Sequence, residues 1–151
     1  MSQFIGFSMP HGEAGQLTRS YFGNVVESKK NDETAPVVAF GDPVKVNATK
    51  DGVSACSGAS DGVYGISVRY FKQANVYTGK PTLEGGKIIP VLVSGYCAIQ
   101  VAEGEPKFGD PVYLNASGKF TANATGGTAV PGAKFMGEKD ANNVVEIAFN
   151  V

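Results

Sequence analysis

The sequence predicts an all-β fold, a compact barrel or sandwich built from two related turn-strand units and preceded by an extended N-terminal arm. The clearest sign is a repeat: residues 40–48 (FGDPVKVNA) return as residues 108–116 (FGDPVYLNA), with seven of nine residues identical at an offset of 68. The 20 Gly and 8 Pro among 151 residues indicate many turns. Several short segments alternate apolar and polar residues, as half-buried strands do, and none has convincing helical periodicity.

Each repeat is a turn that starts a strand. In Gly-Asp-Pro, glycine permits positive φ, aspartate bonds to nearby backbone, and proline fixes φ. The Val-x-Val/Leu-x-Ala that follows alternates like a short strand. Asp42 and Asp110 occupy the same turn context, so we expect them to serve the turns rather than to form the carboxylate pair of a glycosidase.

The chain before the first repeat predicts an arm and a loop. Residues 1–20 are interrupted by Pro10, Gly12 and Gly15, so we expect them to form an extended arm. Residues 28–35 are polar and predict a loop. The rest of the chain is expected to form a single β domain over 21–151, with its larger repeat at 40–101 and 108–151.

Between the two repeats, the sequence predicts two strands and a loop. Residues 63–70 alternate as a half-buried strand, whereas 71–87 are polar and aromatic and predict a long loop or projecting hairpin. Residues 88–101 carry the strongest strand pattern in the chain. Because this pattern is longer than a usual strand, we expect a bend or bulge near Ser94 and Gly95.

The C-terminal part predicts a hairpin, a loop and a closing strand. Ser117 and Gly118 lie at the expected hairpin turn, and residues 121–132 predict a loop rich in Gly, Ala and Thr. Residues 144–151 alternate again. We expect the inward side chains of this last strand to be Val145, Ile147, Phe149 and Val151.

Composition argues against several classes of function. The net charge of −1 lacks the basic excess of a nucleic-acid binder. No apolar run reaches the roughly 20 residues of a membrane helix, and no secretory signal is visible. Cys56 and Cys97 have no metal-ligand spacing, so we expect two reduced thiols in a protein made in the cytoplasm.

Catalytic and cofactor chemistry also lack their usual residues. His11 is the single histidine and lies between Pro10 and Gly12 in the predicted arm, so it is a poor candidate for a nucleophile–histidine site. One histidine and two distant cysteines do not make a zinc site. No phosphate-binding or dinucleotide-binding glycine motif is present. We therefore expect no enzyme activity, metal or cofactor.

The order of turns and strands resembles the small capsid decoration, or cement, proteins of tailed bacteriophages. The resemblance covers roughly residues 20–151. It lies in four stretches: VVES (25–28) leading to TAP and FGDPV (34–44), GVYGISV (62–68), VLVSG (91–95) followed by GDPVY (109–113), and the closing strands from Gly137. The resemblance implies a structural virion protein on the outer head surface, made in the bacterial host cytoplasm.

This resemblance also implies partners. The protein would bridge neighbouring major capsid proteins and associate with copies of itself as a dimer or trimer, and it would bind neither nucleic acid nor membrane. Aromatic and large apolar residues at such spacings occur in cores and protein interfaces. The residues expected at the partner interface are Phe4, Ile5, Phe7, Tyr21, Phe22, Tyr70, Phe71 and Tyr77.

The alternative function is a carbohydrate-binding or host-surface adhesion module of β-sandwich type. Such a module needs an aromatic platform on which sugar rings stack. The aromatic residues available for this platform are Tyr64, Tyr70, Phe71, Tyr77 and Tyr96. The chain has no Trp, the residue that such surfaces favour.

Overall fold

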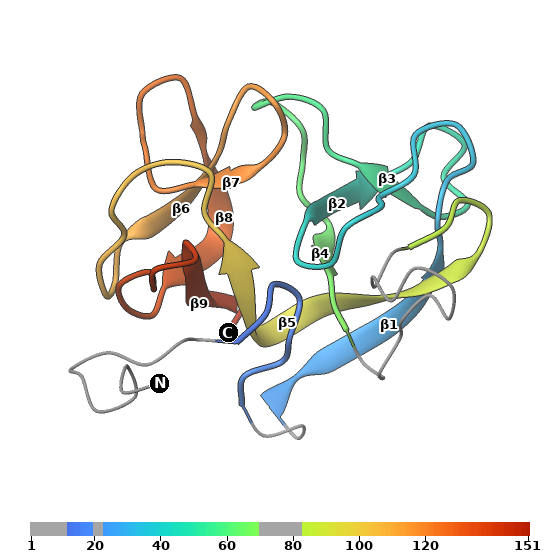
Figure 1. The fold of residues 1–151 in the computed structure, drawn as a ribbon. Helices are drawn as coiled ribbons and strands as arrows, with labels where there is room; N and C mark the ends of the chain where they lie inside the picture. Colours follow the sequence, from blue (N-terminus) through green and yellow to red (C-terminus); the bar gives the residue numbers. More distant parts are fainter. Residues whose placement is uncertain (1–11, 20–22, 70–82) are drawn as a thin grey trace.

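The computed structural model describes residues 12–19, 23–69 and 83–151, and over these residues the protein is all-β, without an α-helix (Figure 1). The all-β prediction is therefore confirmed. The described strands are β1 (Val25–Lys30), β2 (Pro43–Val46), β3 (Val53–Ala55), β4 (Gly65–Ser67), β5 (Ile88–Gln100), β6 (Pro111–Leu114), β7 (Phe120–Thr121), β8 (Thr128–Phe135) and β9 (Val144–Phe149).

All nine strands belong to one curled sheet with β5 at its centre. The order is β3-β2-β4-β5-β9-β8-β6-β7, and β1 also pairs with β5. Figure 1 shows β1 to β4 gathered on one side of the molecule and β6 to β9 on the other, with β5 running between them. We call the described residues up to Ser94, which include β1–β4, the first half, and residues 95–151, which include β6–β9, the second half.

Strand β5 changes partners midway, at Gly95. Its residues up to Ser94 pair with β1, whereas those from Gly95 onward pair with β9. Gly95 has φ of +142°, and a Cβ there would overlap the side chain of Asn24, whose Oδ1 accepts a 2.8 Å hydrogen bond from the Tyr96 N–H. The register of β1 also shifts between Val25 and Val26, opposite Ser94. This irregularity lies where the sequence predicts it.

Two hydrophobic clusters fill the curled sheet. The smaller lies in the first half and contains Val37, Phe40, Val44, Val53, Leu83, Ile89 and Val91. The larger extends from the first half into the second and is centred on Ile99, Phe120, Phe135, Ile147 and Phe149. Because β5 is buried on both faces along much of its length, it contributes to both clusters.

A buried asparagine fixes the curl of the first half. Asn31, just beyond β1, pairs with Val53 of β3, so the sheet bends until its ends meet. The Asn31 side chain is fully buried, donates to the carbonyls of Val37 (2.8 Å) and Glu84 (3.0 Å), and accepts from the Val37 N–H (2.9 Å). A buried amide with all these partners costs little to desolvate and holds three segments together.

The two Gly-Asp-Pro turns make matching backbone hydrogen bonds. Gly41 N donates to Ser67 O (2.6 Å), and Gly109 N donates to Phe135 O (2.8 Å). In return, Ser67 N donates to Asp42 O and Phe135 N donates to Asp110 O. Each position in one set lies 68 residues from its counterpart, the same offset as the sequence repeat. Gly41 and Gly109 both have positive φ, +84° and +89°, which explains glycine at each.

Residues 13–18 lie along the second part of β5, on the edge that β9 does not occupy. Leu17 pairs with Cys97, and Gly15 N donates to Ala98 O (2.7 Å) while Ala98 N donates to Gln16 O (2.9 Å). We call residues 13–18 the strap. Residues 1–11 of the predicted arm lie outside the described residues.

The β6–β7 turn holds the two halves against each other. Gly118 approaches the backbone of Cys56 so closely that a Cβ would overlap the Cys56 carbonyl oxygen. Beside it, Lys119 Nζ lies 2.6 Å from Asp42 Oδ2, in the Gly-Asp-Pro turn of the first half.

Both native thiols, Cys56 and Cys97, are buried and free, in agreement with the predicted reduced state.

Three details of the predicted elements are wrong. Strand β1 runs on to Lys30, inside the predicted loop of 28–35, because it pairs with β5 as far as Ile88. Strand β8 begins at Thr128, inside the predicted loop of 121–132, because its backbone pairs with β6. Val151 is 71% exposed rather than inward, because β9 ends at Phe149.

The role of Gly95 leads to a stability prediction. Substituting Gly95→Ala forces a Cβ into Asn24 at a positive φ, so we expect the free energy of unfolding to fall by about 3 kcal/mol in chemical denaturation. Gly58→Ala is the matched control, because Gly58 lacks positive φ and nothing lies within 4 Å of its added Cβ. Equal stability of the two variants would show that the partner exchange in β5 does not require glycine.

Candidate docking surfaces

The predicted partner-interface residues all lie outside the part of the chain that the structure describes. They are Phe4, Ile5, Phe7, Tyr21, Phe22, Tyr70, Phe71 and Tyr77. His11 is outside it as well. Their place at an interface therefore stays a prediction, and the described residues must supply any surface that can be examined in detail.

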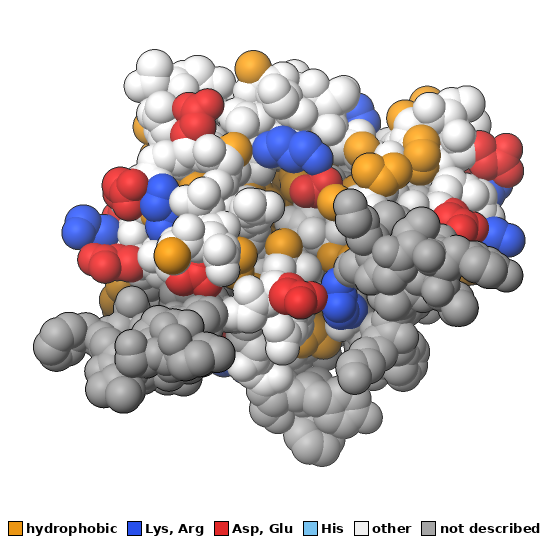
Figure 2. Space-filling model, in the orientation of Figure 1, with side chains coloured by type: hydrophobic (Ala, Val, Ile, Leu, Met, Phe, Trp, Pro, Cys, Tyr) orange, Lys and Arg blue, Asp and Glu red, His pale blue; other side chains and the backbone are white. Residues whose placement is uncertain are grey.

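Several large apolar side chains of the described chain are exposed to solvent. In the view of Figure 2, hydrophobic side chains gather over β2 and β3 at the upper right, beside charged groups, and others are scattered over the second half. The exposed set is Val25, Val38, Val46, Ile88, Phe108 and Val151. Phe108 is the one aromatic residue in this set, and Val38 and Val46 belong to the first half.

The first Gly-Asp-Pro turn is covered by the strap. Gly15 packs so tightly on the turn that an added Cβ would lie 2.5 Å from Phe40 Cβ and 2.9 Å from Gly41 N. The Arg69 guanidinium lies over the Phe40 ring, 5.1 Å from its centroid, and pairs with Glu13 of the strap at 3.0 Å. As a result only 6% of Phe40 is exposed.

No described segment covers the second Gly-Asp-Pro turn in this way. Phe108, the counterpart of Phe40, is 72% exposed. Nothing lies within 4 Å of a Cβ built on Gly109, the counterpart of Gly41. Residue 137, the counterpart of Arg69, is a glycine that is likewise open. Sequence reasoning missed this surface, although the exchange of Arg69 for Gly137 at the repeat offset was a signal for it.

The aspartates of these turns have ordinary structural partners. Asp42 pairs with Lys119 across the two halves, and Asp110 Oδ2 accepts a 3.0 Å hydrogen bond from the Lys107 N–H. The Asp110 carboxylate therefore bonds to the backbone of its own turn, as the sequence predicts, whereas the Asp42 carboxylate joins the two halves, which the sequence did not predict.

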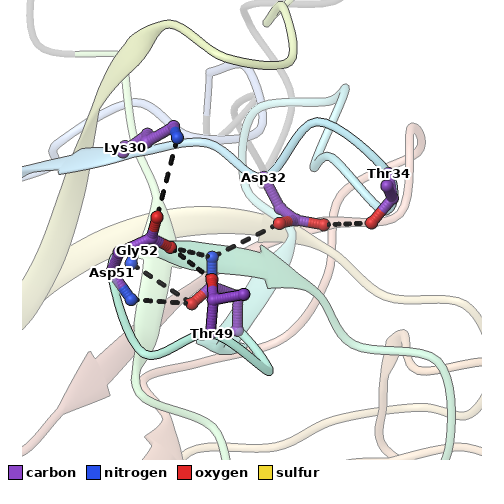
Figure 3. Close-up of polar contacts among 7 residues, drawn as sticks. Lys30, Asp32, Thr34, Thr49, Asp51 and Gly52 are labelled. Atoms are coloured by element: carbon purple, nitrogen blue, oxygen red, sulfur yellow. Dashed lines mark hydrogen bonds and ion pairs between the residues drawn. The ribbon is translucent and has the colours of Figure 1, made fainter.

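A polar network braces the tip of the β2–β3 hairpin against the end of β1 (Figure 3). Asp51 Oδ1 accepts from Thr49 Oγ1 (2.6 Å) and Asn47 Nδ2 (2.7 Å), and Asp51 Oδ2 lies 3.6 Å from Lys30 Nζ. Asn47 Oδ1 accepts from the N–H groups of Asp51 and Gly52. The hydrogen bonds from Thr49 and Asn47 lower the pKa of Asp51 from 3.8 to about 2.

A second carboxylate extends this network to the loop after β1. Asp32 accepts from Thr34 Oγ1 and the Ala35 N–H, both at 2.8 Å, and from Asn47 Nδ2 at 3.3 Å. These bonds lower its pKa below the usual value. The network makes a stiff hairpin tip, and over the described chain no group of three potential metal ligands comes together.

Two shallow clefts open on the described surface. One, of about 220 Å³, lies between the loop of Asp61 and Val63 in the first half and Val130 and Pro131 of β8 in the second. The other, of about 190 Å³, is lined by Lys29, Val46 and Tyr64. Both are smaller than typical small-molecule pockets of 300–1,000 Å³.

The two described tyrosines of the predicted sugar platform have separate neighbours. The Tyr64 hydroxyl donates to Glu27, and Lys29 Nζ lies 5.6 Å from the centroid of the Tyr64 ring. Tyr96 lies under Arg19, which pairs with Glu146 of β9 at 3.0 Å. The other members of that platform fall outside the described residues.

Comparison with known proteins identifies a family. The family model described as "Structural cement protein (E217 gp24/Pam3 gp6)" matches residues 1–150. A chain from the structure titled "The capsid of Myoviridae Phage XM1" superposes with a TM-score of 0.72 at 23% identity, covering 95% of this chain and 93% of that one. No curated protein sequence matches. Within the described residues, no helix is long and apolar enough to cross a membrane.

The polar network predicts a specific response to acid. Because the folded pKa of Asp51 is lower than its value in the unfolded chain, the unfolded state binds more protons between about pH 4 and pH 2. The stability that Asp51 contributes is therefore present above pH 4 and lost as the pH falls through 2. Asp51→Asn should flatten the pH dependence of the free energy of unfolding in that range.

The matched control for this measurement is Glu84→Gln, which neutralises an exposed carboxylate outside the network. Denaturant titrations of wild type and both variants from pH 6 to pH 2 give the comparison. If the Asp51→Asn profile runs parallel to wild type, the network does not hold Asp51 ionised.

Proposed function

We propose, from the premise that this chain belongs to the structural cement protein family of phages, that it binds the outer surface of a phage head and bridges neighbouring major capsid proteins. As a family member it is a structural, capsid-stabilising virion protein. The observation that carries this conclusion is the family match, which spans residues 1–150. The stiff β framework with uncovered apolar side chains supports a role in binding rather than in catalysis.

A protein of this kind stabilises a shell by binding the assembled lattice in preference to the free subunits. An interface of roughly 1,600 Å² suffices for specific docking. Bridging two subunits raises the effective concentration of the second contact, and the symmetry of the head multiplies the gain over every equivalent site. Low net charge and exposed apolar residues suit such an interface.

We further propose that the two halves are related units of one repeat. The hydrogen bonds of the two Gly-Asp-Pro turns support this, because they match at an offset of 68 on both sides. The turns after β2 and β6 support it too: Lys50 N donates to Asn47 O, and Gly118 N donates to Asn115 O. Two similar units in one chain suit a protein that contacts two neighbouring subunits.

We also propose that the N-terminal arm contacts a capsid protein or a second copy in a dimer or trimer. The apolar residues Phe4, Ile5 and Phe7 precede the strap, and each would contribute roughly 1.5–3 kcal/mol if it were fully buried at an interface, before the ordering cost. The aromatic residues of segments 20–22 and 70–82 are proposed for the same kind of contact.

Binding to undecorated heads tests the proposed function directly. The purified protein should co-sediment with undecorated heads, and bound heads should resist heat and osmotic shock better than bare ones. Free capsid subunits should bind much more weakly than the lattice. Failure to co-sediment under any of these conditions, with a folded protein, would contradict a capsid role.

Deleting residues 2–11 tests the arm while leaving the strap in place. We expect the truncated domain to keep its melting temperature and to bind heads at least tenfold more weakly. Deletion of 2–18 is the comparison, because it also removes the strap's hydrogen bonds to β5 and should lower the melting temperature. Undiminished head binding by the shorter deletion would mean that the arm is not an interface.

A further inference from the structure

We infer that the open turn at Phe108 is a docking site for an extended segment of a neighbouring capsid subunit. The site consists of Phe108, Gly109 and Gly137, and we call it the Phe108 turn. The inference rests on the proposed function and names the surface through which that function would act. It is carried by a comparison within the molecule, between this turn and its covered counterpart.

The counterpart shows what such a turn binds. In the first half an extended segment, the strap, lies across Phe40 and Gly41. Gly15 accepts from the Arg69 N–H at 2.7 Å and donates to β5 at 2.7 Å. The covered turn thus receives a backbone with a small residue at the contact point, held by main-chain hydrogen bonds, a common mode of peptide recognition.

The Phe108 turn has the same backbone geometry, and none of the residues that the structure describes lies across it as the strap lies across Phe40. Its glycine has nearly the same φ, +89° against +84°, and donates to the equivalent carbonyl. Yet Phe108 is 72% exposed where Phe40 is 6% exposed. A largely exposed phenylalanine ring beside two open glycines offers an unobstructed apolar contact, and aromatic residues are enriched in protein interfaces.

The surroundings define the chemistry of the occupant. Position 137 is a glycine where the first half has Arg69, so no side chain at this position shields the Phe108 ring or the glycine backbone. Within the described chain, the N–H of Gly137 has no hydrogen-bond partner, whereas that of Arg69 bonds to the strap. An extended segment with an Ala or Gly at the contact point would accept a hydrogen bond from the Gly137 N–H and pack against the Phe108 ring. Lys107 beside Phe108 pairs with Glu138 of the same chain at 3.4 Å, so the contact with that segment is assigned to the Phe108 ring and the glycine backbone.

The occupant is a capsid subunit rather than the strap of a second copy. Every copy already holds its own strap on β5 through hydrogen bonds of Gly15, Gln16 and Thr18. A second copy would have to break these bonds to offer the same segment to a neighbour. A capsid protein can offer an extended segment without that cost.

Site-directed crosslinking tests which chain lies at the Phe108 turn. Both native thiols are buried, so Lys107→Cys introduces an accessible thiol while retaining Phe108. This thiol is labelled with a benzophenone maleimide, and the labelled protein is bound to undecorated heads and irradiated. We expect a crosslink to the major capsid protein, mapped by mass spectrometry to an extended segment.

The other crosslinking results overturn the inference. Crosslinks only between copies of this chain would make a second copy the occupant, and bound protein without crosslinks would leave the turn facing solvent. The proposed function fails separately, because in that case even the wild-type protein does not co-sediment with heads.

Substitutions give a second, independent measurement. Phe108→Ser and Gly137→Val should leave the melting temperature of the free protein unchanged, because both sites are open. Each should weaken head binding at least tenfold, the first by removing the ring and the second by blocking the backbone. Ile88→Ser, which removes a side chain of 65% exposure in the first half, is the control and should bind as wild type. Head binding that is unchanged in Phe108→Ser, or reduced equally in Ile88→Ser, would overturn the inference.

Discussion

The architecture depends on one strand serving two sets of partners. β5 pairs with β1 and β4 before Gly95 and with β9 after it, so the chain must turn sharply within a strand while keeping its hydrogen bonds. A glycine at φ of +142°, with Asn24 packed where a side chain would stand, meets that requirement. Both hydrophobic clusters then contain residues of β5, so this one strand connects the cores of the two halves.

Within this framework, the same turn is used for two purposes. The first Gly-Asp-Pro turn is buried by the strap and stabilises the domain, and the second presents a ring and two glycines to solvent. Backbone geometry is equal in both, so the difference lies only in what covers them. In an internal repeat, one copy of a turn can thus stabilise the domain while the other copy stays available for binding.

Stiffness of the polar parts suits a protein that works by contact. Asn31 and Asn47 are buried with their amides fully engaged, and the carboxylates of Asp32 and Asp51 are held by hydrogen bonds. A surface that is already ordered loses less entropy on docking, so more of the contact energy appears as affinity. For a capsid-stabilising protein, that affinity is the source of the stability conferred on the shell.

The sequence by itself determined the strand-rich class, the positions of the two Gly-Asp-Pro turns and the irregularity at Gly95, because these follow from local φ preferences and from alternation along the chain. It also carried the resemblance to phage cement proteins. Only the tertiary structure decided that residues 13–18 lie on β5, that β8 begins at Thr128, and that Phe40 is buried while Phe108 is exposed. These outcomes depend on which distant segment covers a given residue, and two turns with nearly identical sequences give no local sign of that.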